Sequence, residues 1–247
     1  MYRSGGSNQP YLPLGQMMNP VRNKKSEISV DVQNASRISN GMKILIGTPI
    51  HISKDYSMER WLENVSKLKY PADFFMVDNS PGLDYVEKVK GYCKKYGIKN
   101  FKIDHFEIDQ NLGPDIRIER SQEIIRQEIL SKNYDAWFSW ECDQIIPTNA
   151  LNKLVRLMKA GDFMMVVHNS GARWDPNIHN TNMGVTLIKR ECLEKNWFLP
   201  KKNGRISFDV SDSYNVHDPI FKKRVLAKGG NYLEVFGVIK PIYHLDK

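Results

Sequence analysis

Residues 136–143, with the sequence AWFSWECD, lead from an almost wholly apolar run directly into two carboxylates. A continuous apolar run of this length, next to a turn, is typical of a strand that is buried on both faces of a parallel sheet. Glu141 and Asp143 follow at i and i+2, a spacing that puts both side chains on one side of an extended chain. The stretch predicts a buried strand that delivers two acidic groups to its carboxyl end.

Similar apolar runs recur at intervals before this segment. They predict three earlier strands, at residues 43–49, 73–78 and 101–108. Apolar side chains at helical spacing lie between them, and the first such set is Met58, Trp61, Leu62 and Val65. Four successive strand-helix units indicate an α/β fold, with a mostly parallel central sheet and helices on both faces.

Local signals predict the remaining elements. Gly97 is expected to end the second helix as its C′ residue, and Thr148 is expected to cap a helix that Gly161 closes. Residues 200–214 are predicted to be a polar segment without regular structure. The other predicted elements are helices at 117–131, 190–196 and 219–228 and strands at 163–167, 183–188 and 232–239.

Composition excludes several protein classes. The 247 residues are 41% hydrophobic and 26% charged, as in ordinary globular proteins, and unlike collagens, coiled coils or disulfide scaffolds. No apolar run is long enough to span a membrane, and the polar first residues do not resemble a signal peptide. The three cysteines are widely spaced and fit no zinc pattern. We therefore expect a cytoplasmic protein.

The net charge is +8, of which residues 1–41 carry +3. Glycine, proline and polar residues interrupt any hydrophobic period in 1–41, so we expect this segment to be a flexible basic tail. A basic excess favours anionic partners such as nucleotides and phosphates. It is too diffuse to predict binding to nucleic acid.

The chemistry is expected at the ends of the predicted strands, because parallel α/β sheets bind ligands beyond their carboxyl ends. Carboxylates such as Glu141 and Asp143 are oxygen ligands that suit Mg²⁺ or Mn²⁺. Acidic residues are also common in turns, and Asp78 in the sequence DNSPG fits that alternative. Asp218, directly before Pro219, would also serve as a helix cap.

Taken in order, these segments resemble the GT-A glycosyltransferases, above all glycosyltransferase family two, over about residues 42–247. Glu141-Cys142-Asp143 takes the place of the family's Asp-x-Asp motif. The resemblance implies a single Rossmann-like GT-A domain after the tail. Residues 42–160 would form its nucleotide-binding half and residues 161–247 its acceptor-binding half.

The resemblance also implies the residues that bind the donor nucleotide. The first strand, the strand ending at residue 78 and the sequence NLG at 111–113 are similar to donor-binding segments of the family. The residues implied at the donor nucleotide are Thr48, Pro49, Asp78, Gly113, Arg117, Arg120 and Glu141.

The metal, the base and the acceptor site are implied in the same way. Asp143 and the late His244 would ligate Mn²⁺ or Mg²⁺, and Asp218 would be the catalytic base of an inverting enzyme. Trp174 and Gly184 would lie near the acceptor and the sugar. Two departures from the family pattern are Glu141 in place of the first aspartate and His217 in place of the acid before the base.

The function implied is metal-dependent transfer of a sugar from a nucleoside-diphosphate sugar to an acceptor hydroxyl. The acceptor class, whether glycan, lipid, protein or nucleic acid, is not implied. Three alternatives remain. A nucleotidyltransferase would carry a glycine-rich phosphate loop after its first strand, where this chain has Gly47-Thr48-Pro49. The others are a transferase that modifies nucleic acid and a non-catalytic binding protein.

Overall fold

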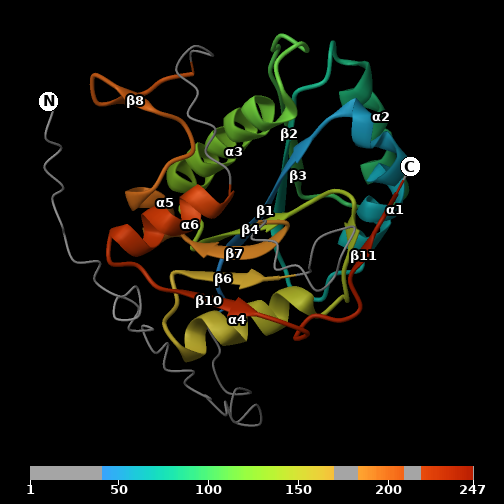
Figure 1. Cartoon of the computed structure of the whole chain (residues 1–247). Helices are drawn as coiled ribbons and strands as arrows, with labels where there is room; N and C mark the ends of the chain where they lie inside the picture. Colours follow the sequence, from blue (N-terminus) through green and yellow to red (C-terminus); the bar gives the residue numbers. More distant parts are fainter. Residues whose placement is uncertain (1–40, 170–182, 209–217, 247) are drawn as a thin grey trace, which may run out of the picture. The chain divides into compact units, whose positions relative to one another are not determined.

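The computed structural model describes residues 41–169, 183–208 and 218–246. Seven strands form its main sheet, in the order β10-β6-β7-β4-β1-β2-β3 (Figure 1). Neighbouring strands are parallel except at β7, which runs antiparallel to both β4 and β6. The predicted, mostly parallel sheet is confirmed. The strands are β1 (Ile44–Ile50), β2 (Asp73–Asp78), β3 (Phe101–His105), β4 (Ala136–Trp140), β6 (Met165–His168), β7 (Val185–Lys189) and β10 (Tyr232–Val235).

Helices cover both faces of this sheet, as predicted (Figure 1). The apolar sides of three helices pack into the core on one face: α1 (Asp55–Ser66), α2 (Asp84–Lys95) and α4 (Ala150–Ala160). The opposite face is covered by α3 (Pro114–Ser131), α5 (Arg190–Lys195) and α6 (Asp218–Ala227).

β4 contributes to both cores because its successive side chains point to opposite faces. Trp140 meets Trp61 of α1 edge to face, with 5.2 Å between ring centroids. On the other face Trp137 meets Phe198, which stacks on Phe221 of α6 at 4.6 Å. All five rings are fully buried, so the apolar run that precedes Glu141 is a strand enclosed on both sides.

Several predicted boundaries were wrong. β10 ends at Val235 rather than at residue 239. Thr148 does not cap α4, because the helix begins at Ala150, with Asn149 at the N-cap position and no side-chain capping bond. β3 ends at His105 rather than at residue 108. α3 begins three residues earlier than predicted, since Pro114 fits the first turn of a helix, where its missing N–H is not needed.

Residues 200–214 were predicted to lack regular structure, but a short hairpin lies within them. β8 (Lys201–Lys202) pairs with β9 (Arg205–Ile206) across a turn of Asn203 and Gly204. Both turn residues have positive φ, 51° and 77°, which is what a two-residue hairpin turn requires. The Asn-Gly signal was overlooked because its flanking residues are charged rather than alternately apolar.

Two further findings concern the rest of the chain. In the described ranges no helix is long and apolar enough to cross a membrane. Cys93, Cys142 and Cys192 are free thiols, and all three are buried. The proposed basic tail lies almost wholly outside the described residues, so its boundary near residue 41 stays a prediction.

His168 ends β6 as a buried histidine. Its side chain is 3% exposed, and among the described residues neither ring nitrogen has a hydrogen-bond partner. Burial lowers the pKa of His168 to about 4, and the nearby charges of Lys240 and Lys153 act in the same direction. The folded protein therefore holds this imidazole neutral.

Gly47 in β1 allows α3 to approach the sheet. A Cβ at this position would lie 2.4 Å from Ile125 Cγ2 and 2.6 Å from Trp137 Nε1, which donates a hydrogen bond to the Gly47 carbonyl. We predict that Gly47→Ala lowers the free energy of unfolding by about 1–3 kcal/mol, as overpacked cores do. Gly91→Ala in α2 is the control, because its Cβ meets no atom within 4 Å. Urea unfolding measures both, and equal stability of the two variants would contradict this packing.

The pKa of His168 predicts a loss of stability in acid. Because the folded-state pKa lies below the unfolded value near 6.5, the unfolded state binds the extra proton as pH falls from about 6.5 to about 4. The linked loss by pH 4 is about 3 kcal/mol. His168→Leu should remove most of this loss, as measured by urea unfolding at pH 7 and pH 4.5. An unchanged acid loss in the variant would contradict the prediction.

Candidate active site

The site is built around the turn that follows β4. β4 lies parallel to β1, and the Thr48 hydroxyl donates a buried hydrogen bond of 2.9 Å to the carbonyl of Trp140, the last residue of β4. Pro49 follows within β1, opposite Val77 of β2. The predicted residues Thr48 and Pro49 therefore lie at the carboxyl edge where Glu141 emerges, although the Thr48 hydroxyl is occupied by the backbone.

Glu141 and Gly184 are in direct contact. The Glu141 N–H donates to the Gly184 carbonyl at 2.9 Å, and the Glu141 carboxylate accepts a 2.9 Å bond from Gln144 Nε2. A Cβ at residue 184 would lie 2.5 Å from Gln144 Nε2 and 2.9 Å from the Glu141 carboxyl carbon. Only glycine leaves room for this arrangement, so the structure brings these two predicted residues together.

His244 reaches the same turn from the end of the chain. β11 (Tyr243–His244) pairs antiparallel with β5 (Gln144–Ile145), which sets His244 opposite Gln144. The Nε2 atoms of these two residues are 2.9 Å apart, and the Leu245 N–H donates to the Asp143 carbonyl at 2.8 Å. His244 thus lies beside the acidic turn, and its role as a metal ligand stays a prediction.

Asp143 is buried against a lysine that the sequence analysis missed. Its Oδ2 forms an ion pair with Lys54 Nζ and accepts from the Tyr56 hydroxyl at 3.4 Å. Burial acts to lower the pKa of Lys54, but the hydrogen bond and charge of Asp143 outweigh it and the pKa is raised. Lys54 closes the short helix η2 (Ile52–Lys54) after β1. A cation in the loop directly after the first strand was the available signal.

The residue types at this turn suit a divalent cation, but they are held by protein partners. Glu141 and His244 both contact the side-chain amide of Gln144, whereas Asp143 is engaged by Lys54. Within residues 41–169, 183–208 and 218–246, no three His, Cys, Asp or Glu side chains are gathered as ligands of one ion. An ion bound by Asp143 would therefore take over the charge pairing that Lys54 supplies.

Asp78 is fully buried and engaged at the end of β2. Oδ1 accepts from the Ser80 hydroxyl at 2.6 Å and from the Ser80 N–H at 3.2 Å, and Oδ2 lies 2.7 Å from His105 Nδ1. Burial acts to lower the pKa of His105, but the bonds to Asp78 and Glu107 outweigh it and raise the pKa. These bonds fit the turn interpretation of Asp78, and its contact with the donor nucleotide stays a prediction.

The two predicted arginines of α3 have different surroundings. Arg117 donates to Gln110 Oε1 at 2.7 Å, and the same oxygen lies 3.0 Å from His51 Nε2. Arg117 is thereby tied to the loop after β1. Arg120 is 3% exposed and donates to the carbonyls of Ile116 and Phe208, so it is directed into the protein.

The structure gives little information on three other predicted site residues, Gly113, Asp218 and Trp174. Gly113 comes directly before α3, and a Cβ placed there would meet no atom within 4 Å, so nothing in its packing demands glycine. Asp218 is the first residue of α6, but its side chain lies outside what the structure describes. Trp174 also lies outside the described residues.

Comparison with solved structures finds glycosyltransferases. A mannosyltransferase from Pyrobaculum calidifontis, in complex with GDP-Man and Mn²⁺, matches 81% of this chain with a TM-score of 0.56 at 12% identity. Residues 1–349 of S. aureus TarS, in complex with UDP-GlcNAc, match 83% of it with a TM-score of 0.58 at 13% identity. The chain spans 56% and 59% of these two structures. No family model and no curated protein matches the sequence.

Identities this low establish the fold alone. This chain contributes to that likeness a mostly parallel sheet with helices on both faces. The chain has the α/β fold of nucleotide-sugar glycosyltransferases, the GT-A architecture that the sequence resemblance implied.

Proposed function

We propose that this protein transfers a sugar from a nucleoside-diphosphate sugar to an acceptor hydroxyl at the turn after β4. The observation that carries the proposal is the meeting of Glu141, Asp143, Lys54 and His244 at the carboxyl edge of a sheet with this fold. Residues 42–160 would bind the nucleotide and residues 161–247 the acceptor. A nucleotidyltransferase is less favoured, because the loop after β1 is not glycine-rich.

The cations at this edge suit a diphosphate. Lys54 and Arg117 both come from segments that begin at the carboxyl edge, and their charge would favour binding of the anionic donor. Asp143 and His244, with Glu141 beside them, would hold Mn²⁺ or Mg²⁺. The bound ion would neutralise the diphosphate and make it a better leaving group.

Asp218 is proposed as the base. The acceptor oxygen would form its new bond to the anomeric carbon as the bond from that carbon to the diphosphate oxygen breaks, with inversion at the carbon. The acceptor proton would pass to the Asp218 carboxylate. Asp218 begins α6, so a capping role at the same position is compatible with this one.

Asp143→Asn tests the metal site. We expect Mn²⁺-dependent binding of UDP or GDP to weaken at least about tenfold, because the variant lacks the carboxylate charge nearest the proposed ion. Calorimetric titration with and without Mn²⁺ is the measurement, and thermal melting verifies that the variant is folded. Asp162→Asn, in an exposed ion pair with Lys189, is the control. The metal assignment would be refuted if Asp143→Asn bound the nucleotide as tightly as the wild type. It would also be refuted if the wild-type affinity were the same with and without Mn²⁺.

Asp218→Asn tests the reaction itself. Wild-type protein should release nucleoside diphosphate from at least one member of a panel of UDP- and GDP-sugars when an acceptor is present. The variant should bind the donor normally and lose about 10²–10⁴-fold in turnover, because the amide keeps the shape of the side chain but takes up no proton. Asp209→Asn and Asp212→Asn are assayed in parallel, and a loss of turnover in one of them instead would make that aspartate the base. Full turnover by Asp218→Asn would remove it as the base, and no release from any donor would count against the proposed function.

A further inference from the structure

Three cations surround Trp197, the half-buried residue two positions after α5. Lys201 Nζ lies 3.7 Å and Lys228 Nζ 4.1 Å from the centre of its indole ring. Arg224 of α6 donates to the Trp197 carbonyl at 2.9 Å. Cation–π attraction to one ring stabilises the two ammonium groups but does not neutralise them.

No carboxylate balances this charge in the described part of the chain. Lys201, Arg205, Arg224 and Lys228 form no ion pair there, whereas the nearby Lys195 is paired with Glu191. Burial lowers the pKa of Lys228, and the charges of Arg224 and Lys201 lower it further. The protein holds these cations together against mutual repulsion, which a bound anion would relieve.

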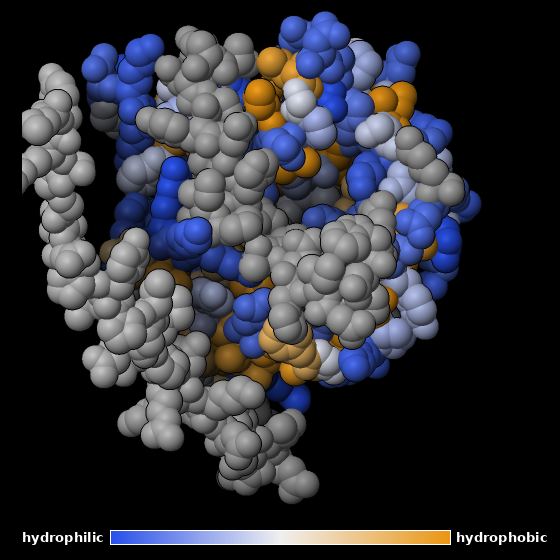
Figure 2. All heavy atoms as spheres, in the orientation of Figure 1, coloured by the Kyte–Doolittle hydropathy of each residue, from blue (hydrophilic) through white to orange (hydrophobic). Residues whose placement is uncertain are grey.

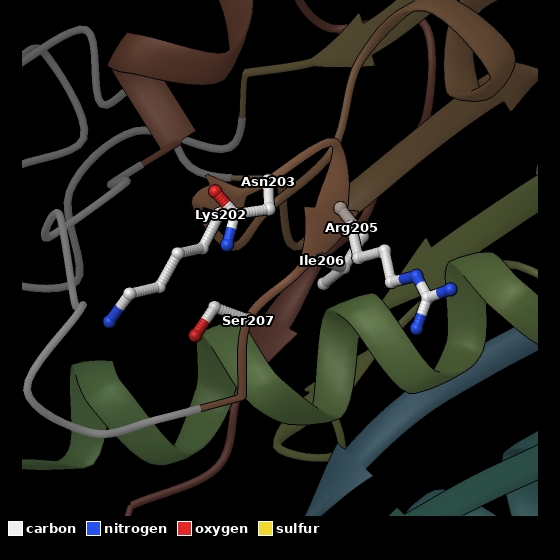
Figure 3. Close-up of a pocket in the computed structure, with 5 residues that line it drawn as sticks. All are labelled: Lys202, Asn203, Arg205, Ile206 and Ser207. Atoms are coloured by element: carbon white, nitrogen blue, oxygen red, sulfur yellow. The ribbon is translucent and has the colours of Figure 1, made fainter.

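The cationic side chains continue along the hairpin of β8 and β9. Lys201, Lys202 and Arg205 are exposed, and hydrophilic side chains cover this region of the surface (Figure 2). In Figure 3, Lys202 and Arg205 point to opposite sides of the hairpin, and the Ser207 hydroxyl lies between them above α3. A flat surface would meet only some of these groups, whereas a flexible chain can contact both sides.

The hairpin also leads toward the candidate active site. Phe208, which follows β9, accepts a 3.4 Å bond from Arg120 Nε of α3, one turn beyond Arg117. Residues just before Trp197 are held to the same helix, because Arg126 Nε donates to the Leu193 and Asn196 carbonyls at 2.7 Å. A ligand lying along this side of α3 would run toward the carboxyl edge of the sheet.

We propose that these residues form a binding surface for a polyanionic chain with repeated phosphate groups. The surface, named here the hairpin surface, consists of Trp197, Lys201, Lys202, Arg205, Arg224 and Lys228. Its cations come from the hairpin and from α6, so one isolated phosphate would reach only a few of them, while a polymer would bridge them and release its counterions. Such a chain would also suit the role of sugar acceptor. That role rests on the proposed function, whereas binding of the chain to the hairpin surface does not.

The test compares two triple variants with equal loss of charge. Lys201→Gln, Arg205→Gln and Lys228→Gln together alter the hairpin surface. The control removes three lysines of the α1 and α2 region that are paired with glutamates, by Lys67→Gln, Lys90→Gln and Lys95→Gln. The probe is inorganic polyphosphate of defined length, titrated at 50, 100 and 200 mM NaCl, with thermal melting of every variant.

We expect wild-type binding that weakens as salt rises, a loss of at least about tenfold and a smaller salt dependence in the hairpin variant, and a change within about twofold in the control. Equal losses in the two triple variants, or no loss in the hairpin variant, would overturn the proposal. If the hairpin triple variant does not fold, the single variant Arg205→Gln, at an exposed residue, should still weaken binding about threefold. Unchanged binding by this single variant would contradict the proposal.

Two further measurements distinguish polymer binding from membrane binding, and the hairpin surface from the proposed sugar transfer. Vesicles with 20% anionic phospholipid should bind more weakly than polyphosphate of equal phosphate concentration, and tighter binding to vesicles would overturn the choice of a polymer. Polyphosphate binding at the hairpin surface in a protein that transfers no sugar would support this surface and count against only the proposed function.

Discussion

The candidate site depends on the pairing of β4 with strands on both sides. β1 lies parallel on one side and β7 antiparallel on the other, so the chain leaves the sheet at Trp140 in a single fixed direction. The bond from the Thr48 hydroxyl to the Trp140 carbonyl fixes the last residue of the strand. The backbone of Glu141, the first acidic residue of the turn, is then held by its N–H bond to the carbonyl of Gly184, which comes directly before β7.

Much of the fold could be predicted because burial leaves a periodic trace in the sequence. The apolar run of β4 and the helical spacing of Met58, Trp61 and Leu62 reflect side chains that are fully buried in the structure. The hairpin of β8 and β9 left no such trace, because its side chains are exposed and only backbone conformation at Asn203 and Gly204 identifies it. Thr148 was wrongly predicted as the cap of α4 because Thr148 and Asn149 are both residue types that favour the N-cap position, which Asn149 occupies.

The site was predicted only in part, because the contacts that were missed join residues far apart in the sequence. Strand ends and the resemblance indicated Glu141, Asp143 and His244, and the ladder between β5 and β11 accounts for their meeting across 100 residues. No periodicity reports an ion pair between Lys54 and Asp143, which are 89 residues apart. Asp78 and Arg120 were implied as donor contacts by the family resemblance, and sequence does not reveal that their polar atoms bond within the protein.

The central claim is that a nucleotide and a divalent cation bind at the turn after β4. The most direct test is a crystal structure of the protein grown with Mn²⁺ and UDP or GDP, with anomalous diffraction data to locate manganese. The account predicts an anomalous peak within about 2.2 Å of an Asp143 carboxylate oxygen, with the diphosphate beside it and Lys54 no longer bonded to Asp143. A nucleotide bound elsewhere on the protein, with the Lys54–Asp143 pair intact, would contradict it.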